Sequence, residues 1–106
     1  MSEPMYAMQR ANGEWLTAQI EGTLSLPVFR NAAAARRVHD RLGFLMVYRP
    51  QPLDSMVIER LKRQTPELKF WLVDEFAPTA DLTPGRWLSP SEVITMGDEG
   101  DYAKSA

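Results

Sequence analysis

The densest group of side chains that could do chemistry lies between residues 24 and 43, in the stretch LSLPVFRNAAAARRVHDRLG. It contains Arg36, Arg37 and Arg41, together with His39, the only histidine of the chain. An imidazole can exchange a proton near neutral pH, and clustered guanidinium groups bind phosphate or carboxylate. This stretch is therefore the first candidate for a catalytic or anion-binding site.

A catalytic His39 would need an acidic partner from elsewhere in the chain. Asp74 and Glu75 end the apolar run KFWLVDE, and the carboxyl ends of strands are favoured ligand positions in α/β sheets. Neighbouring strand residues point to opposite faces, so the two carboxylates do not form a catalytic pair with each other. An enzyme that uses His39 with Asp74 or Glu75 is one hypothesis.

A structural role for His39 is the alternative. Ala35, Val38 and Leu42 are spaced by three and then four residues, which is typical of the buried stripe of a helix. His39 flanks this stripe, so it can be a half-buried scaffold residue with no part in chemistry.

A second basic group follows on the next expected helix, at Arg60, Lys62 and Arg63. If both helices pack on one side of a sheet, the two groups merge into a surface that could bind phosphate, RNA or an acidic protein. Otherwise they are the solvated outer faces of amphipathic helices. The candidate binding residues are Arg36, Arg37, His39, Arg41, Arg60, Arg63, Trp71 and Trp87.

Specific catalytic and cofactor motifs are missing from the sequence. It contains no GxGxxG, no GxxxxGK[ST] and no GxSxG pattern. Without cysteine it can have neither disulfides nor a thiolate metal site. We expect no cofactor and no metal, and a non-enzymatic role is favoured over an enzyme.

Length and composition describe an ordinary small domain. The chain has 106 residues, of which 44% are hydrophobic and 25% charged, and its net charge is −2. This charge is not the basic footprint of a nucleic-acid-binding protein. The first residues, MSEPMYAMQR, do not resemble a secretory signal, and no apolar run approaches the ~20 residues of a membrane span. We expect a cytoplasmic chain that does not enter the membrane.

The charge changes sign along the sequence. Residues 1–75 carry ten Lys and Arg against nine Asp and Glu, whereas residues 76–106 carry two against five. This shift divides the chain into a compact body at 1–75, a C-terminal segment at 76–97 that folds back on the body, and a loose acidic tail at 98–106.

Three strands are expected first, at Met5–Arg10, Glu14–Ile20 and Leu24–Phe29. The pairs Asn12-Gly13 and Glu21-Gly22 between them are turn-forming sequences, because these residue types accept positive φ angles.

A helix is expected next, at Ala32–Leu42. Asn31 can cap its first turn, and Gly43 stands where a left-handed C-terminal cap belongs. Pro27 cannot donate a ladder hydrogen bond, so its strand lies at a sheet edge or its nitrogen points away from the neighbouring strand.

The second half predicts a strand at Phe44–Arg49, an extended connector at Arg49–Pro52 and a helix at Ser55–Gln64. A strand at Lys69–Glu75 follows. Ser89 and Glu92 then form a capping-box pattern that begins a short helix ending by residue 97. The fold class is therefore mixed α/β (α+β), with about five strands in the order β-β-β-α-β-α-β plus a short C-terminal helix.

The strand KFWLVDE is apolar on both faces and must be covered on both. Phe70 and Leu72 face one way, and Trp71 and Val73 face the other. The two helices could divide between the faces. If they share one face, the segment that runs from Phe76 to Ile94 covers the other, or a second chain does; we favour the C-terminal segment, with a homodimer as the alternative.

The stretch LPVFRNAAAA, with EWLTAQIEGTLSL before it and KFWLVDE after it, resembles small bacterial α/β domains. The SseB-type (enhanced serine sensitivity) N-terminal domain and several uncharacterised bacterial families have a similar segment of strand, cap and helix. The resemblance spans about residues 14–75 and implies a small accessory or interaction domain. It offers no catalytic residues to carry over.

The sequence as a whole predicts a small, bacterial, non-enzymatic domain that binds a protein partner or a second copy of itself. A small-ligand or nucleic-acid binder that uses the basic helix faces is one alternative. The enzyme built on His39 is the other.

Overall fold

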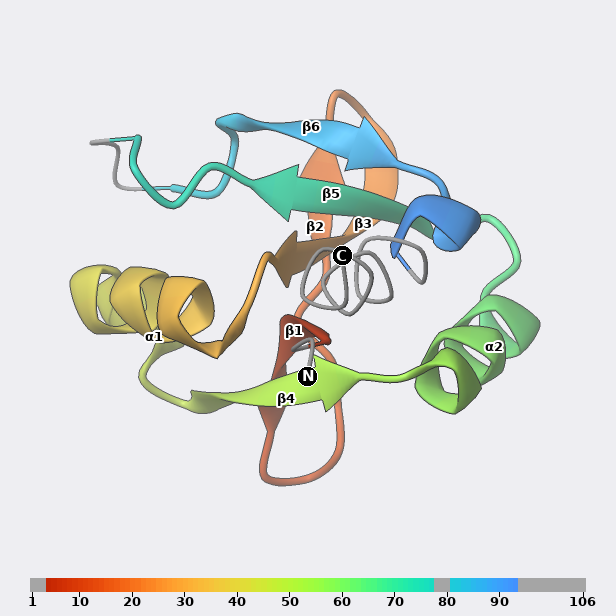
Figure 1. Cartoon of the computed structure of the whole chain (residues 1–106), viewed down its shortest axis with the longest axis horizontal. Coiled ribbons are helices and arrows are strands. Elements are labelled where there is room, and N and C mark those ends of the chain that lie inside the picture. The colour runs from red at the N-terminus through yellow and green to blue at the C-terminus, as the bar shows by residue number, and fades with distance from the viewer. Residues whose placement is uncertain (1–3, 78–80, 94–106) are drawn as a thin grey trace, which may run out of the picture.

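The sheet and its two helices are described by a computed structural model that covers residues 4–77 and 81–93. Figure 1 shows the strands crossing the molecule, with one helix on either side. The elements are β1 Met5–Arg10, β2 Ala18–Ile20, β3 Thr23–Phe29, α1 Ala32–Arg41, the 3₁₀ helix η1 Gly43–Leu45, β4 Tyr48–Leu53, α2 Ser55–Gln64, β5 Lys69–Val73 and β6 Gly85–Leu88.

The strands form one mixed sheet in the order β4-β1-β3-β5-β6, with β2 paired to β3. β3 and β5 are parallel, as expected for strands joined by a crossover, and every other described pairing is antiparallel. The predicted fold class is confirmed, with one strand more than the five expected.

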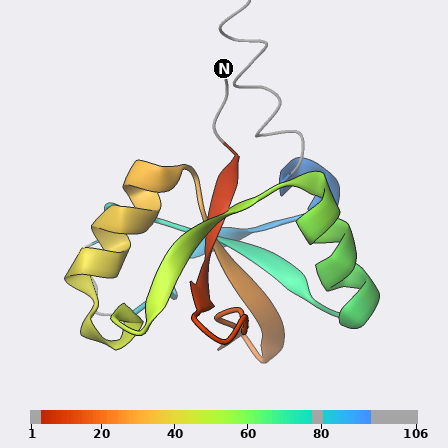
Figure 2. The ribbon, with the colours of Figure 1, turned by 90° about the horizontal axis from the view of Figure 1, so that it is seen from below.

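The helices divide between the two faces of the sheet, as Figure 2 shows. In β5, Phe70 and Leu72 join the apolar cluster under α2, while Trp71 and Val73 join the cluster under α1. We call these two sides the α2 face and the α1 face. Of the arrangements that the sequence left open, the one with a helix on each face is therefore correct.

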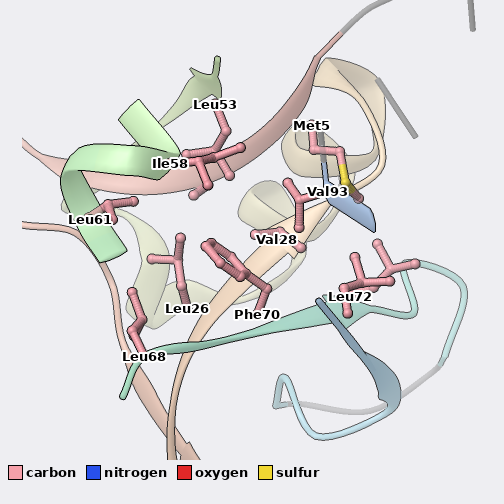
Figure 3. Close-up of a cluster of buried hydrophobic side chains, with 12 residues drawn as sticks. Met5, Leu26, Val28, Leu53, Ile58, Leu61, Leu68, Phe70, Leu72 and Val93 are labelled. Atoms are coloured by element: carbon pink, nitrogen blue, oxygen red, sulfur yellow. The ribbon is translucent and has the colours of Figure 1, made fainter. Parts of the chain in front are cut away.

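The cluster on the α2 face is drawn in Figure 3. Leu26 of β3 and Phe70 of β5 are fully buried beneath Ile58 and Leu61 of α2. Burial of a large apolar side chain contributes about 2–3 kcal/mol, so this cluster is a main source of stability. It also fixes the register between the central strands and α2.

Three predicted helix starts are capped as the sequence indicates. The Asn31 side chain accepts a hydrogen bond from the Ala34 amide at 2.8 Å, and Asp54 accepts one from the Val57 amide at 2.9 Å. Ser89 and Glu92 make a reciprocal pair: each side-chain oxygen accepts from the other residue's backbone N–H, at 3.1 and 3.0 Å. This is the capping box that the sequence predicted, and helix follows it from residue 90 to 93.

The region after α1 differs from the prediction. Gly43 does not adopt positive φ and is not a left-handed cap; it begins η1 instead. The predicted strand Phe44–Arg49 is wrong as well, because the chain turns through η1 before β4 begins at Tyr48. A run of four apolar residues fits a strand and a half-buried turn equally well, and here only Leu45 is buried.

The segment expected to be a connector, Arg49–Pro52, lies inside β4. Pro50 pairs with Met8 and Pro52 pairs with Tyr6 along β1. Both prolines are tolerated because β4 is an edge strand, and residues two apart direct their nitrogens to the same side.

Pro27, by contrast, does not lie on an edge. β3 is central, with β5 on one side and both β1 and β2 on the other. Along that second side β2 pairs with residues 23–25 and β1 with residues 28–29, so Pro27 lies where the partner changes. The gap in the pairing accommodates a residue that has no N–H.

The remaining differences concern strand ends and one strand that the sequence did not predict. The strand expected at Glu14–Ile20 is regular only from Ala18, although Trp15 makes an isolated bridge to Gln9. β5 ends at Val73 rather than Glu75, and β6 was not predicted. The predicted helix end near residue 97 and the predicted tail at 98–106 lie outside the described residues.

The close packing around Gly85 predicts that a larger residue there destabilises the protein. A Cβ placed there would meet the carbonyl oxygen of Leu72, and it would come within 2.8 Å of the indole nitrogen of Trp71. We expect Gly85→Ala to lower the free energy of unfolding by about 1–3 kcal/mol, measured by chemical denaturation.

Gly43→Ala is the matched control, since a Cβ at Gly43 meets nothing within 4 Å and φ is not positive. This variant should stay within about 0.5 kcal/mol of the parent. Equal stability of the two variants would contradict the close approach of β6 to β5.

Candidate functional site

The arginines of α1 hold the chain that leaves β5. The Arg37 side chain donates a hydrogen bond from Nη1 to Glu75 Oε1 at 2.9 Å. The Arg41 side chain donates one from Nη1 to the Glu75 carbonyl oxygen at 3.0 Å. The Arg37 guanidinium also lies 5.2 Å from the ring centroid of Phe76. Of the three candidate arginines on α1, all of them exposed, Arg37 and Arg41 therefore hold residues 75 and 76 against the helix.

Both ring nitrogens of His39 contact neighbouring groups of the protein. One ring nitrogen, Nε2, lies 3.0 Å from the Tyr48 carbonyl oxygen, and Nδ1 lies 3.1 Å from Asp40 Oδ1. The bond to Tyr48 joins the end of α1 to the start of β4, on the side of the helix away from Glu75. These contacts are compatible with the scaffold role that the helical spacing indicated.

The acidic partners suggested for a catalytic His39 are engaged elsewhere. The carboxylate of Asp74 accepts from the Phe76 amide at 3.0 Å, and the carboxylate of Glu75 pairs with Arg37. Both ring nitrogens of His39 are occupied by other groups. The contacts of the described residues do not assemble the proposed acid–base pair.

The two basic groups do not merge. Arg60 and Arg63 are exposed on α2, and Arg36, Arg37 and Arg41 belong to α1 on the opposite face of the sheet. A single continuous arginine surface, which a polyanion would require, is therefore not formed by these helices.

The two candidate tryptophans are part of the packing between β5 and β6. Trp71 and Trp87 are paired across the strands, with ring centroids 4.7 Å apart and planes at 75°. The Trp71 indole N–H donates to the Leu82 carbonyl oxygen at 3.0 Å. Trp71 is buried, whereas Trp87 is half-buried at the rim of the sheet.

Exposed apolar side chains gather next to α1. In the described part of the chain, five large apolar side chains are more than half exposed: Phe44 at 53%, Met46 at 78%, Val47 at 59%, Met56 at 69% and Phe76 at 74%. Phe44, Met46 and Val47 lie in the turn that follows α1, Phe76 lies beside Arg37 of α1, and Met56 lies on α2. We call Phe44, Met46, Val47 and Phe76 the α1-side surface.

The α1-side surface is continued by a small apolar hollow. This hollow has a volume of about 220 Å³ and is bounded by Phe44, by segment 16–20 and by segment 81–83. Residues 81–83 follow Phe76 in the chain and lead to β6. The Asp74 amide donates a hydrogen bond to the Pro84 carbonyl oxygen at 2.9 Å, which joins the end of β5 to the start of β6. Phe44 thus borders this hollow, while Phe76 lies beside Arg37 of α1.

Two larger hollows have mixed linings. One of about 750 Å³ lies at the end of β6 and includes Lys62, Glu67, Trp87 and Glu92. The Lys62 ammonium there donates to the carbonyl oxygens of residues 66 and 68, which fixes it in a structural role. The other, of about 500 Å³, lies between α2 and the turn at residues 12–15.

Comparisons with known proteins gave no match from which a function could be assigned. No family model, curated protein or solved structure matches the chain. The resemblance to SseB-type domains stays a prediction. Within residues 4–77 and 81–93, no group of three His, Asp or Glu is placed to hold a metal ion, and none of the helices there is long and apolar enough to cross a membrane.

The α1-side surface was not found from the sequence. The sequence predicts a strand at Phe44–Arg49 and, if both helices share a face, a segment from Phe76 to Ile94 that covers the other face; neither prediction leaves these side chains exposed as a group. The one feature that could have exposed the error is the pair of alternating prolines after Tyr48, since they fit an edge strand and leave residues 43–47 to form the turn.

The contacts of Arg37 yield a prediction with a matched control on the same helix. Arg37→Ala should increase amide hydrogen exchange at Phe76 and Ala77, because it removes the ion pair and the ring contact that hold this segment. The free energy of unfolding should fall by less than about 1 kcal/mol, since the pair is partly solvated.

Arg36→Ala, which changes an exposed arginine of the same helix, should leave this exchange unchanged. Equal exchange at residues 76 and 77 in both variants would mean that Arg37 does not hold the segment.

Proposed function

We propose that this chain is a non-enzymatic protein-binding module and that the α1-side surface docks its partner. The observation that carries the proposal is that both segments adjoining α1 expose large apolar side chains: Phe44, Met46 and Val47 in the turn that follows it, and Phe76 beside Arg37. Groups of exposed apolar side chains, such as Phe44, Met46 and Val47 on one turn, are typical of interaction sites, because water contact with them is unfavourable.

The side chains of this surface are presented on fixed backbone. Leu45 is fully buried and anchors η1, while the Leu45 and Met46 amides donate to the carbonyl oxygens of Leu42 and Gly43 at 3.0 and 3.1 Å. Phe44, Met46 and Val47 therefore project from a short turn tied to the core. Preorganised side chains lose less conformational entropy on binding, which favours affinity.

The surface also combines the residue types that dominate protein interfaces. Phe44 and Phe76 are aromatic, Met46 is adaptable, and Arg37 stacks beside Phe76. Aromatic residues, methionine and arginine are enriched at interfaces, and a few such anchors carry most of the binding energy. The resemblance to small bacterial accessory domains supports the same role.

The alternatives have weaker support. A nucleic-acid or phosphate binder would need one continuous basic surface, and the arginines of α1 and α2 lie on opposite faces of the sheet. An enzyme based on His39 would need a free ring nitrogen beside Asp74 or Glu75, and both ring nitrogens have other partners.

The proposal predicts the loss of a partner when the surface is made polar. The triple variant Phe44→Ser, Met46→Ser, Val47→Ser and the parent chain are each used as bait in a lysate of the source organism, with quantitative mass spectrometry. Truncation of an interface anchor costs 2 kcal/mol or more, so recovery of the partner should fall by more than about tenfold.

Met56→Ser is the control, because Met56 is equally exposed but lies on α2. It should retain the partner. Circular dichroism of each bait checks that the fold is intact. Partner recovery that is unchanged in the folded triple variant, or that is lost in the Met56 variant, would overturn the assignment of the surface.

A further inference from the structure

The two ends of the strand path β4-β1-β3-β5-β6 are built differently. β4 forms one edge and carries Pro50 and Pro52, and proline at an edge removes the N–H groups that another strand would need. β6 forms the other edge with the sequence GRWL, which contains neither proline nor lysine. In Figure 1, β6 lies at the rim of the sheet, beyond β5 and away from both helices.

We propose that β6 pairs with β6 of a second copy of this chain, antiparallel and about a two-fold axis. The pairing would join two sheets into one and goes beyond the docking role of the α1-side surface. Strand addition at an open edge is a recurrent mode of association, in which main-chain hydrogen bonds supply affinity and side chains set the register.

The faces of β6 restrict the register. Arg86 pairs with Leu72 and Leu88 with Phe70, which places both on the α2 face, while Trp87 pairs with Trp71 on the α1 face. A two-fold axis perpendicular to the sheet keeps each face on its own side. Residues that lie opposite each other must then come from the same face.

Of the registers that satisfy this condition, two are centred on the inner residues of β6, Arg86 and Trp87. One places Arg86 opposite Arg86 of the partner subunit, which brings like charges together and is unfavourable. The other places Trp87 opposite Trp87 of the partner subunit, and Arg86 opposite Leu88 of the partner subunit. The second register is favoured, because it extends the existing pair of Trp71 and Trp87 into a ladder of four rings on the α1 face.

Charges at the two ends of β6 match this register. Arg86 and Glu92 lie 3.6 Å apart in one chain, and both are about half exposed. The hydrogen bond from the Ser89 amide holds the pKa of Glu92 below its ordinary value, so its carboxylate is charged at neutral pH. In the antiparallel dimer, Arg86 of each copy approaches the end of β6 that carries Glu92 in the other, so the attraction already present within each chain extends across the interface.

The two-fold symmetry of the pairing also limits the assembly to a dimer. A two-fold interface uses the same patch on both copies, so pairing of β6 with β6 stops at a dimer. Pairing of β6 with the β4 edge of another copy would produce an open filament, and the prolines of β4 prevent it.

Charge inversion tests the proposal. The parent chain should dimerise in a concentration-dependent way in sedimentation velocity and light scattering. Arg86→Glu alone places two acidic groups at each end of the interface, and Glu92→Arg alone places two basic groups there. Each single variant should weaken dimerisation by at least about tenfold.

The decisive experiment mixes the Arg86→Glu and Glu92→Arg chains, because their charges are then complementary across the interface. It should form a heterodimer with an affinity near that of the parent, which loss of folding in a variant could not produce. The milder Arg86→Gln should weaken the dimer less than Arg86→Glu, and Phe44→Ser should leave it unchanged.

A parent chain that stays monomeric up to millimolar concentration would overturn the proposal. So would single variants that dimerise like the parent, a mixture that forms no heterodimer, or a dimer that is lost with Phe44→Ser. The last result would place self-association on the α1-side surface instead of β6.

Discussion

The structure depends on two central strands that are apolar on both faces. β3 and β5 pair in parallel, and residues Leu26, Phe70 and Leu72 are buried on one side while Phe29, Trp71 and Val73 are buried on the other. Such strands cannot leave a face to water, and a sheet built on them needs two separate covers. One helix on each face meets this requirement.

The division of the helices decides what the surface can do. It separates the arginines of α1 from those of α2 and so removes the continuous basic surface that their sequence grouping suggested. It also places α1 beside the chain that leaves β5, where Arg37 and Arg41 bind Glu75. The cationic side chains that looked available for a ligand are in part the means by which a loop carrying Phe76 is held.

The sequence predicted most elements that depend on local chemistry. Asn31, Asp54 and the pair Ser89 and Glu92 cap helices as their types indicate, because a capping hydrogen bond involves residues only three apart. Val38 is buried as its helical spacing requires.

The elements that the sequence predicted wrongly depend on pairing with strands that are distant in the chain. Whether Phe44–Val47 forms a strand or a turn is decided by the pairing of β4 with β1, whose paired residues lie 38 to 48 positions earlier in the chain. The strand GRWL was not predicted because it is short and its apolar residues are stabilised by β5. The sequence left open whether Pro27 lies at a sheet edge or directs its nitrogen away from a neighbouring strand, because the change of partner along β3 has no mark in the local sequence. The α1-side surface was missed for the same reason.

Methionine methyl groups give the most direct measurement of the central claim, that the α1-side surface is the docking site. Met46 and Met56 are similarly exposed, whereas Met5 and Met8 are buried, so methyl NMR with a soluble paramagnetic agent should broaden the first two and spare the others. When the captured partner is added, the account predicts that Met46 shifts and becomes protected while Met56 stays exposed. Protection of Met56 with no change at Met46 would contradict it.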